Sequence, residues 1–457
     1  MTHASRVCVG VCCMRHPRAC TDSATVDSTA IDSSRAQNIR IVFASKHPDR
    51  GAALVRGTQV AEHWPNAVML GGARVFQACR ILSGGSAVGS SKQTCARRSR
   101  NLLVIHLKDL SHSLFDSLPY ATHVLDPIDK IYRGWSVPAD RRLCGLLTHS
   151  EAQAALYRSH GARRAWVAPD HGLPGCEEDS GGGSSSSSSS GLGDKFLSSR
   201  RIFERRTVLV LGGAPSDPLR VGLSTWAAEQ QLRRRSSPVT VLYEKDLRSS
   251  IAFSQSAGWS AWLCTLLRNN VSIAVAWDQI SGLAFEADCQ AHMGLGRAEC
   301  LALKPAERFI VPQSAGVPAI GYRYPSFREA ARAGVYGAAD VAATASSSKV
   351  SDLLLAGTID GLLTRLTWLT SNHSHWEHAR AHGRAVGAAH SMRAVTAAYE
   401  RVRSKAMRSK APGERCSDSE EGLGGGLAIP STRSSRKRAR VPVRRPGEHL
   451  IPLPVAG

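Results

Sequence analysis

The segment from Lys304 to Gly321 carries the most informative combination of residue types in the chain. Pro305 suits the first turn of a helix, where no N–H donor is needed, and Gly316 suits the residue that ends one. Lys304 would then lie at the helix N-terminus, where unpaired N–H groups and the helix dipole favour an anion. Arg308 follows one turn later on the same face. The spacing predicts a site for an anion such as a diphosphate; the alternative is an ordinary helix with two cations on its exposed side.

A pair of glycines, Gly212 and Gly213, follows the apolar strand expected at Thr207–Leu211. Glycine at such a place lets a phosphate approach the backbone closely. The dinucleotide pattern G-x-G-x-x-G is missing, and arginines 233–235 stand where that pattern would need an acidic residue. Patterns typical of phosphate-loop, zincin and α/β-hydrolase sites are also missing from the sequence. The two glycines therefore favour a phosphate contact that differs from a dinucleotide oxidoreductase site.

The block from Lys304 to Gly321 resembles the K-P-x-x-R/K…A-G-x-P-x-I segment in the C-terminal lobe of GT-B glycosyltransferases of the family 1 and family 4 type. The Y/S-x-R-E element that follows in those enzymes is matched by Tyr324 to Glu329. In that family the block lines the nucleotide-sugar site. The residues to which the resemblance transfers donor contacts are Lys304, Arg308, Ser314, Gly316, Pro318 and Glu329.

One position departs from the GT-B pattern. Many members hold the donor ribose with a glutamate where this chain has Val311, and an aliphatic side chain cannot accept that hydrogen bond. Either the donor is held differently or the site has lost activity. A shorter match lies in the first half of the chain, where Arg56–Ala61 is similar to an R-G-x-Q-x-A helix beside the cleft of some GT-B-like proteins. Its alternative interpretation is an amphipathic helix with a solvated arginine.

The resemblance implies a transferase that moves a sugar from a nucleoside-diphospho-sugar donor to an acceptor. Lys304 and Arg308 would stabilise the leaving diphosphate, so neither a metal ion nor a further cofactor is implied. The first alternative is a binding protein of the same fold that has lost transfer. The second is a nucleic-acid-binding protein that uses its basic C-terminal tail.

A catalytic base, which an inverting reaction would need, is expected from the first lobe. Parallel α/β sheets place their ligands at the ends of strands, and the proton acceptors found at or just after such ends are His47, His106, Asp126 and Asp129. The alternative for each residue is a turn residue or a solvated charge. A retaining reaction would not need this base, so the stereochemistry stays open.

Histidine and cysteine patterns suggest no metal centre. Four histidines (His373, His375, His378 and His382) have helical spacing that is compatible with metal binding, but a polar terminal helix explains them more simply. Four of the twelve cysteines fall in the first twenty residues, without paired C-x-x-C spacing and without an apolar signal-peptide core. We therefore expect reduced thiols.

Short β-rich runs alternate with helical stretches from residue 39 onward, as in a parallel sheet with crossover helices. The expected strands of the first half are Ile39–Ala44, Ala67–Leu70, Leu102–Leu107, His123–Leu125, Gly145–Thr148 and Ala165–Ala168, with helices at Ala52–Trp64 and Glu151–His160. These elements predict a Rossmann-like lobe over residues 39–174, on the acceptor side.

The alternation resumes after residue 206. The expected strands are Thr207–Leu211, Val239–Tyr243, Val271–Ala276 and Pro318–Gly321, with helices at Ala227–Leu232, Trp259–Arg268, Pro305–Ala315 and Ser326–Ala333. They predict a second Rossmann-like lobe over residues 206–345, on the nucleotide-sugar side, so that two α/β lobes face one cleft. Residues 346–405 read as C-terminal helices of the kind that brace the first lobe in two-lobed transferases.

Three segments read as disordered: residues 1–38, the Gly/Ser-rich linker at 175–205 and the basic tail at 406–457. The net charge of +21 favours anionic ligands, including phosphates and nucleic acid. No apolar run is long enough to span a bilayer, and we expect a cytoplasmic protein. An organelle transit peptide at 1–21 and a nuclear-localisation segment at Arg436–Arg440 remain alternatives.

Overall fold

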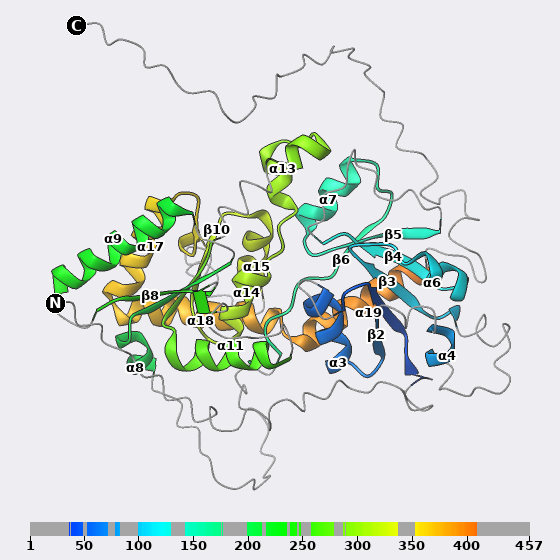
Figure 1. Cartoon of the computed structure of the whole chain (residues 1–457), viewed down its shortest axis with the longest axis horizontal. Coiled ribbons are helices and arrows are strands. Elements are labelled where there is room, and N and C mark those ends of the chain that lie inside the picture. The colour runs from blue at the N-terminus through cyan, green and yellow to red at the C-terminus, as the bar shows by residue number, and fades with distance from the viewer. Residues whose placement is uncertain are drawn as a thin grey trace, which may run out of the picture.

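The chain folds into two α/β lobes that lie side by side, each built on a parallel sheet (Figure 1). The computed structural model describes residues 36, 38–48, 53–71, 78–82, 99–128, 142–174, 176, 199–212, 216–234, 238–244, 246–247, 257–277, 287, 289–336 and 352–408. The Rossmann-like α/β architecture expected from the alternation of strands and helices is confirmed.

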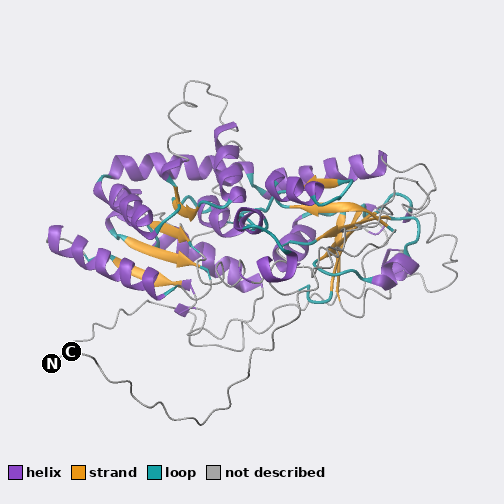
Figure 2. Cartoon of the chain, turned by 90° about the horizontal axis from the view of Figure 1, so that it is seen from above, coloured by secondary structure: helices purple, strands orange, loops and turns teal. Residues whose placement is uncertain are grey.

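The first lobe holds a six-stranded sheet in the order β2-β1-β3-β4-β5-β6. Its strands are β1 (Ile41–Ser45), β2 (Ala67–Gly71), β3 (Leu103–Leu107), β4 (Thr122–Asp126), β5 (Leu143–Thr148) and β6 (Ala165–Val167). Its helices are the π-helix η1 (Leu54–Gln59), α3 (Val60–His63), α4 (Ala78–Leu82), α6 (His112–Ser117) and α7 (Glu151–Ser159). Strand β1 is buried along its whole length because helices cover both faces of the sheet (Figure 2).

The second lobe holds a five-stranded sheet in the order β11-β10-β9-β7-β8. Its strands are β7 (Thr207–Leu211), β8 (Thr240–Tyr243), β9 (Ile273–Ala276), β10 (Ala319–Tyr322) and β11 (Leu355–Ala356). Its helices are α8 (Ser199–Glu204), α9 (Asp217–Arg234), α11 (Ala257–Asn270), α13 (Arg297–Ala302), α14 (Glu307–Ser314) and α15 (Pro325–Tyr336). Strand β11 lies in the segment expected to be purely helical. The sheet of the second lobe therefore extends past residue 345, where the lobe was expected to end.

Three helices follow: α17 (Ile359–Ser371), α18 (His373–Ala389) and α19 (Met392–Arg408). Helix α18 packs on α14 and α15 in the second lobe, whereas α19 contacts β3, α3 and β6 in the first (Figure 1). Val395, Tyr399 and Val402 of α19 belong to the first-lobe core. The expected return of the C-terminal helices to the first lobe is therefore confirmed, and α19 extends three residues past position 405.

The lobes also share a core. The segment that follows Cys289 leaves the second lobe and inserts Leu295 and Leu303 among Leu146 and Tyr157 of the first lobe. Figure 1 shows this crossing where α13 lies beside α7. Burial of apolar side chains from both lobes holds them together.

Disulfides between described residues contradict the expectation of reduced thiols. Cys176 pairs with Cys264 and Cys289 with Cys300, with Cα–Cα distances of 5.5 and 6.0 Å. The first pair is 88 residues apart in sequence, so only the fold brings its sulfurs together. Among the described residues, no helix has both the length and the apolar character to cross a membrane.

Candidate functional site

The second sheet reverses its strand order beside β7. The chain passes from β7 to β8 on one side of it and then to β9 on the other. In open α/β sheets ligands bind outside the carboxyl ends of the strands at such a switch point. Gly212 directly follows β7 and Trp277 directly follows β9. The topology therefore locates a candidate site at these two residues.

Gly212 and Arg308, which the sequence singled out separately, meet at the switch point. A Cβ atom added to Gly212 would lie 3.4 Å from Nη1 of Arg308 and 3.5 Å from the carbonyl oxygen of Trp277. Gly212 also has a φ of +134°, which L side chains rarely adopt. The backbone conformation therefore requires glycine here, whereas a Cβ would make only ordinary van der Waals contacts. Arg308 is an exposed residue of α14, and its guanidinium lies beside Gly212 at this point.

Helix α14, which carries Arg308, begins later than expected. Its N-cap is Ala306, so Lys304 and Pro305 precede the helix instead of opening it. The N–H of Ala306 already donates to Oδ2 of Asp170 at 3.0 Å. A first-lobe carboxylate therefore takes the place at the helix N-terminus where a diphosphate was expected. Lys304 is only 8% exposed, whereas Arg308 is exposed.

Three residues of the expected donor block serve the fold. Ser314 Oγ accepts from the N–H of Leu173 at 3.1 Å and donates to the carbonyl of Val311 at 2.7 Å. Gly316, with a φ of +73°, ends α14 as expected. The carbonyl of Pro318 accepts the N–H of Ala274 at 2.9 Å. Their polar groups hold α14 and β10 in place. We therefore expect these residues to make fewer contacts with a donor than the resemblance implies.

Glu329 joins the two lobes. Its carboxylate oxygens accept the N–H groups of Glu151 and Ala152 at 2.7 and 2.8 Å. These two residues form the first turn of α7, whose positive end favours a carboxylate. Glu329 therefore binds the first lobe in this structure, and the donor contact inferred for it is already replaced by a protein contact.

The expected base Asp126 lies in the core. It is fully buried, with Oδ2 bound by Nε of Arg56 at 2.7 Å and Oδ1 by the N–H of Ile128 at 3.0 Å. His106 is also fully buried; its Nε2 lies 3.0 Å from Nδ1 of His123, and its Nδ1 accepts the N–H of Ser111. Strand pleating explains both corrections, because a side chain near a strand end can still face the core.

The structure describes one of the other two candidates for a base, His47. His47 is exposed and lies two residues after the end of β1. This strand is flanked by β2 and β3, so His47 stands at the switch point of the first sheet. Asp129 lies outside the described residues, as do Gly213 and the basic segment Arg436–Arg440.

The junction contains a buried charge cluster that the sequence did not reveal. Arg56 is 2% exposed and binds Asp126 at 2.7 Å and Asp170 at 2.6 Å. Its Nη2 donates to the carbonyl of Ala168 at 3.1 Å. The solvated arginine considered for this helix is therefore the wrong interpretation. Gly57 lets the helix approach the sheet, because a Cβ there would lie 2.6 Å from Leu107.

The pKa values of the two carboxyl groups in this cluster are shifted in opposite directions. Burial raises the pKa of Asp126 above its ordinary value, although Arg56 opposes the rise. For Asp170 burial acts in the same sense, but Arg56, His149 and the Ala306 N–H together hold the pKa below its ordinary value. Burial also lowers the pKa of His149. One guanidinium shared by two carboxylates suits a structural clamp better than a proton shuttle.

No known protein family matches this sequence, and no characterised protein is significantly similar to it. Function must therefore follow from the geometry of the switch point. There the Arg308 guanidinium, a glycine and a buried carboxylate converge. The N–H of Gly212 donates to Oε2 of Glu244 at 2.9 Å. Glu244 lies 32 residues after Gly212, outside the spacing of about twenty residues at which the dinucleotide pattern has its acidic residue. The signal was its place directly after the second strand of the lobe.

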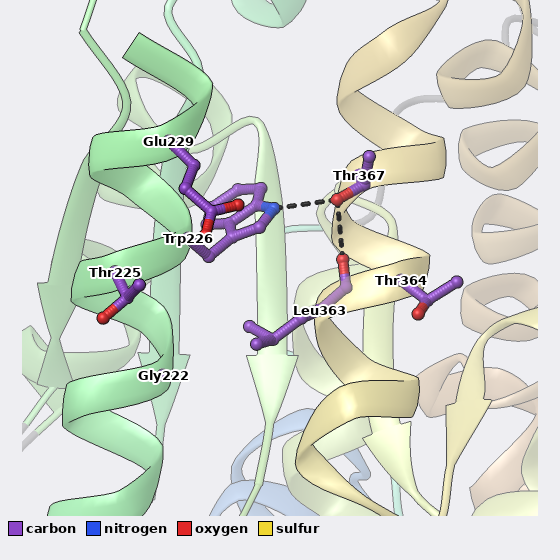
Figure 3. Close-up of a pocket in the computed structure, with 7 residues that line it drawn as sticks. All are labelled: Gly222, Thr225, Trp226, Glu229, Leu363, Thr364 and Thr367. Carbon is purple, nitrogen blue, oxygen red and sulfur yellow. Dashed lines mark hydrogen bonds between the residues drawn. The ribbon is translucent and has the colours of Figure 1, made fainter. Parts of the chain in front are cut away.

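A separate cavity of about 450 Å³ opens between α9 and α17 (Figure 3). Across it, Trp226 Nε1 donates to Oγ1 of Thr367 at 2.9 Å. The other lining residues are Gly222, Thr225, Glu229, Leu363 and Thr364. The lining contains one carboxylate and no cation, so this cavity does not suit a diphosphate.

Proposed function

We propose that this protein is a GT-B-like glycosyltransferase that binds a nucleoside-diphospho-sugar at the carboxyl ends of β7 and β9. The observation that supports the proposal is the position of the Arg308 guanidinium beside Gly212 at the switch point of the second sheet, with Nη1 3.4 Å from where a Cβ on Gly212 would lie. A guanidinium binds phosphate oxygens with two parallel hydrogen bonds, and a glycine lets them reach the backbone.

Arg308 would act on the leaving group. As the glycosidic bond to the nucleotide breaks, negative charge grows on the terminal phosphate of the diphosphate. A fixed guanidinium beside that phosphate stabilises the transition state more than the ground state and thereby speeds the reaction. Because this charge is supplied by the protein, the proposed transfer is independent of a metal ion.

The acceptor would bind on the first lobe. If the reaction inverts the sugar, His47 is the exposed one among the candidates that the structure describes, and it would take the proton of the acceptor hydroxyl. Asp126 and His106 are withdrawn from this role because their polar atoms are engaged in the core. A retaining transfer would leave His47 dispensable.

A thermal-shift screen of nucleoside diphosphates and their sugars tests the proposal. A ligand that binds the native state at 100 times its dissociation constant stabilises it by about 2.7 kcal/mol, so a binding nucleotide raises the Tm measurably. We expect Arg308→Ala to lose this rise. The exposed Arg332 of α15 provides the matched control, since Arg332→Ala should keep it. If no nucleoside diphosphate or nucleotide sugar raises the Tm of the wild type, the proposal is wrong.

A binding protein of the same fold without transferase activity is the second candidate. It is favoured by the burial of Asp126 and His106, and by Val311, which is 6% exposed at the place of the ribose-binding glutamate. Incubating the wild type with whichever nucleotide sugar binds, then quantifying free nucleoside diphosphate, separates the two. Release of the diphosphate that Arg308→Ala abolishes supports a transferase. Tight binding with no release supports the binding protein.

A further inference from the structure

Opposite charges flank Gly212 at the proposed donor site. On the side of α14 lies the Arg308 guanidinium, with Nη1 3.4 Å from the position of a Cβ on Gly212. On the side of β8 lies the Glu244 carboxylate, with Oε2 2.9 Å from the Gly212 nitrogen. The two charged groups thus approach one glycine from two different elements. A ligand seated at Gly212 would meet a cation at one end and a carboxylate at the other.

The Glu244 carboxylate determines which part of a nucleotide could bind on each side of Gly212. A carboxylate repels phosphate oxygens, and Glu244 is only 5% exposed, so water screens that repulsion weakly. A carboxylate accepts hydrogen bonds from hydroxyls, and each of its oxygens can accept more than one. In a nucleoside diphosphate the ribose hydroxyls and the phosphates lie at opposite ends of one sugar. Such a ligand matches both charges.

The place of Glu244 in the fold has the same implication. It directly follows β8, the second strand of its lobe, and β7 with Gly212 is the first. In dinucleotide-binding folds of this class an acidic residue about 20 positions after the first turn accepts a ribose hydroxyl of a nucleotide whose phosphates lie near that turn. Glu244 holds a comparable place after the second strand, although it lies 32 residues after Gly212. Position 311, by contrast, holds a valine in α14 that is 6% exposed and cannot accept a hydrogen bond through its side chain.

We propose that Glu244 accepts the ribose hydroxyls of the nucleoside diphosphate whose phosphates bind Arg308. This inference rests on the proposed function and deepens it. It makes Glu244 a specificity residue that selects ribonucleotides over nucleotides without ribose hydroxyls. It also orients the donor, with its ribose toward the edge strand β8 and its diphosphate toward α14.

Binding of ribonucleotides and their 2′,3′-dideoxy counterparts tests this assignment. Isothermal titration of the wild type with ADP, GDP, CDP and UDP, and then with the dideoxy form of each binder, gives a ribose preference. Hydrogen bonds to a charged group are worth enough for a preference of about 10- to 100-fold. Glu244→Gln keeps an oxygen for the Gly212 N–H but removes the charge, and we expect it to reduce the preference to about threefold or less.

Asp246 supplies the matched control. It lies two residues from Glu244, its side chain is 55% exposed, and its carboxylate pairs with Arg220 at 3.4 Å. Asp246→Asn also removes one negative charge from the segment that follows β8, and this variant should keep the full ribose preference. A loss of preference in both variants would indicate an effect of net charge and would overturn the assignment to Glu244.

The outcomes separate this inference from the proposed function. Nucleotide binding that depends on Arg308 but shows no ribose preference in the wild type refutes the role of Glu244 alone, and this comparison needs no substitution at Glu244. A preference that survives Glu244→Gln refutes it as well. Failure of the wild type to bind every nucleoside diphosphate refutes both proposals.

Discussion

Arg56 holds together the polar part of the lobe junction. Its guanidinium neutralises Asp126 of β4 and Asp170 at the end of the first lobe, while Asp170 in turn caps Ala306 in the second. Removing one partner of a buried ion pair leaves an uncompensated charge, which costs far more than the loss of an exposed pair. The cluster therefore connects the stability of the first lobe to its contact with the second.

We expect Arg56→Met to lower the free energy of unfolding by about 3–5 kcal/mol, because two carboxylates would remain buried without their cation. Urea denaturation followed by circular dichroism measures this. Arg158→Met is the matched control: Arg158 pairs with Glu151 at 3.4 Å, but the two side chains are 46% and 69% exposed. The control should cost about 1 kcal/mol or less. Similar costs for both variants would show that the Arg56 cluster is not a structural clamp.

His382 makes the stability of the protein depend on pH. Burial lowers the pKa of this α18 side chain from 6.5 to about 4. Between these values the unfolded chain binds a proton that the folded chain does not, so stability is complete above pH 6.5 and falls as the pH drops toward 4. The group contributes roughly 3 kcal/mol to this loss, since each pH unit between the two pKa values is worth about 1.4 kcal/mol.

The free energy of unfolding should therefore fall between pH 7 and pH 4 by roughly 3 kcal/mol less in His382→Leu than in the wild type. Urea denaturation at both pH values measures this difference. The other titrating groups are common to both proteins and cancel in the difference. His378 lies one turn earlier on the same helix and is exposed, so His378→Leu should leave the pH dependence of the wild type almost unchanged. Parallel pH profiles for the wild type and His382→Leu would contradict this prediction.

At the scale of elements, α18 packs against α14 with almost no space between the backbones. A Cβ on Gly387 would lie 2.7 Å from Cα of Ser314 and 3.1 Å from the carbonyl oxygen of Gln313. The end of the helix that presents Arg308 is thereby seated on the C-terminal half of α18. Glycine is the residue that permits this approach.

Gly387→Ala should destabilise the protein by about 1–3 kcal/mol, although alanine by itself favours a helix by about 1 kcal/mol. The clash is with backbone atoms, which cannot move without shifting α14. Gly383→Ala, one turn earlier, provides the control because its Cβ would meet only the Gln313 side chain, at 3.4 Å. Thermal denaturation should show a lower Tm for the first variant and an equal or higher Tm for the second. The reverse order would mean that α18 is not closely seated on α14.

At the scale of the whole molecule, α19 makes the first lobe depend on the C-terminal end of the chain. Val395, Tyr399, Val402 and Ala406 are buried against the first sheet, more than 200 residues after its last strand. Each large apolar side chain contributes about 1.5–3 kcal/mol when buried. Their sum is comparable with the total stability of a domain.

We therefore expect a chain that ends at Ser391 to lose the cooperative unfolding of its first lobe, because that lobe would expose the face that α19 covers. A chain that ends at Arg408 keeps α19 and serves as the control. Calorimetry and one-dimensional NMR of the two shortened proteins measure the difference. An unchanged Tm for the chain that ends at Ser391 would show that the lobe is stable without this helix.

The sequence by itself determined most of the elements. Ten strands were predicted close to their observed positions, and Thr207–Leu211 agrees with β7 at both ends. These signals are local: apolar runs, the glycines that end elements and the spacing of helical faces act over a few residues. Gly316 at the end of α14 is such a signal. The two-residue strand β11 was missed because it has too few residues to carry a pattern.

Only the tertiary structure decided what the polar residues of the anion site do. Lys304, Ser314 and Glu329 have the right types for a donor site, but burial and contacts formed in the fold turn them toward the protein itself. Arg56 finds Asp126 and Asp170 across 70 and 114 residues. Glu244 and Gly212 meet because β8 is paired with β7. A hydrogen bond needs atoms within about 3 Å of each other, and between distant segments only the packing of sheets and helices sets that distance.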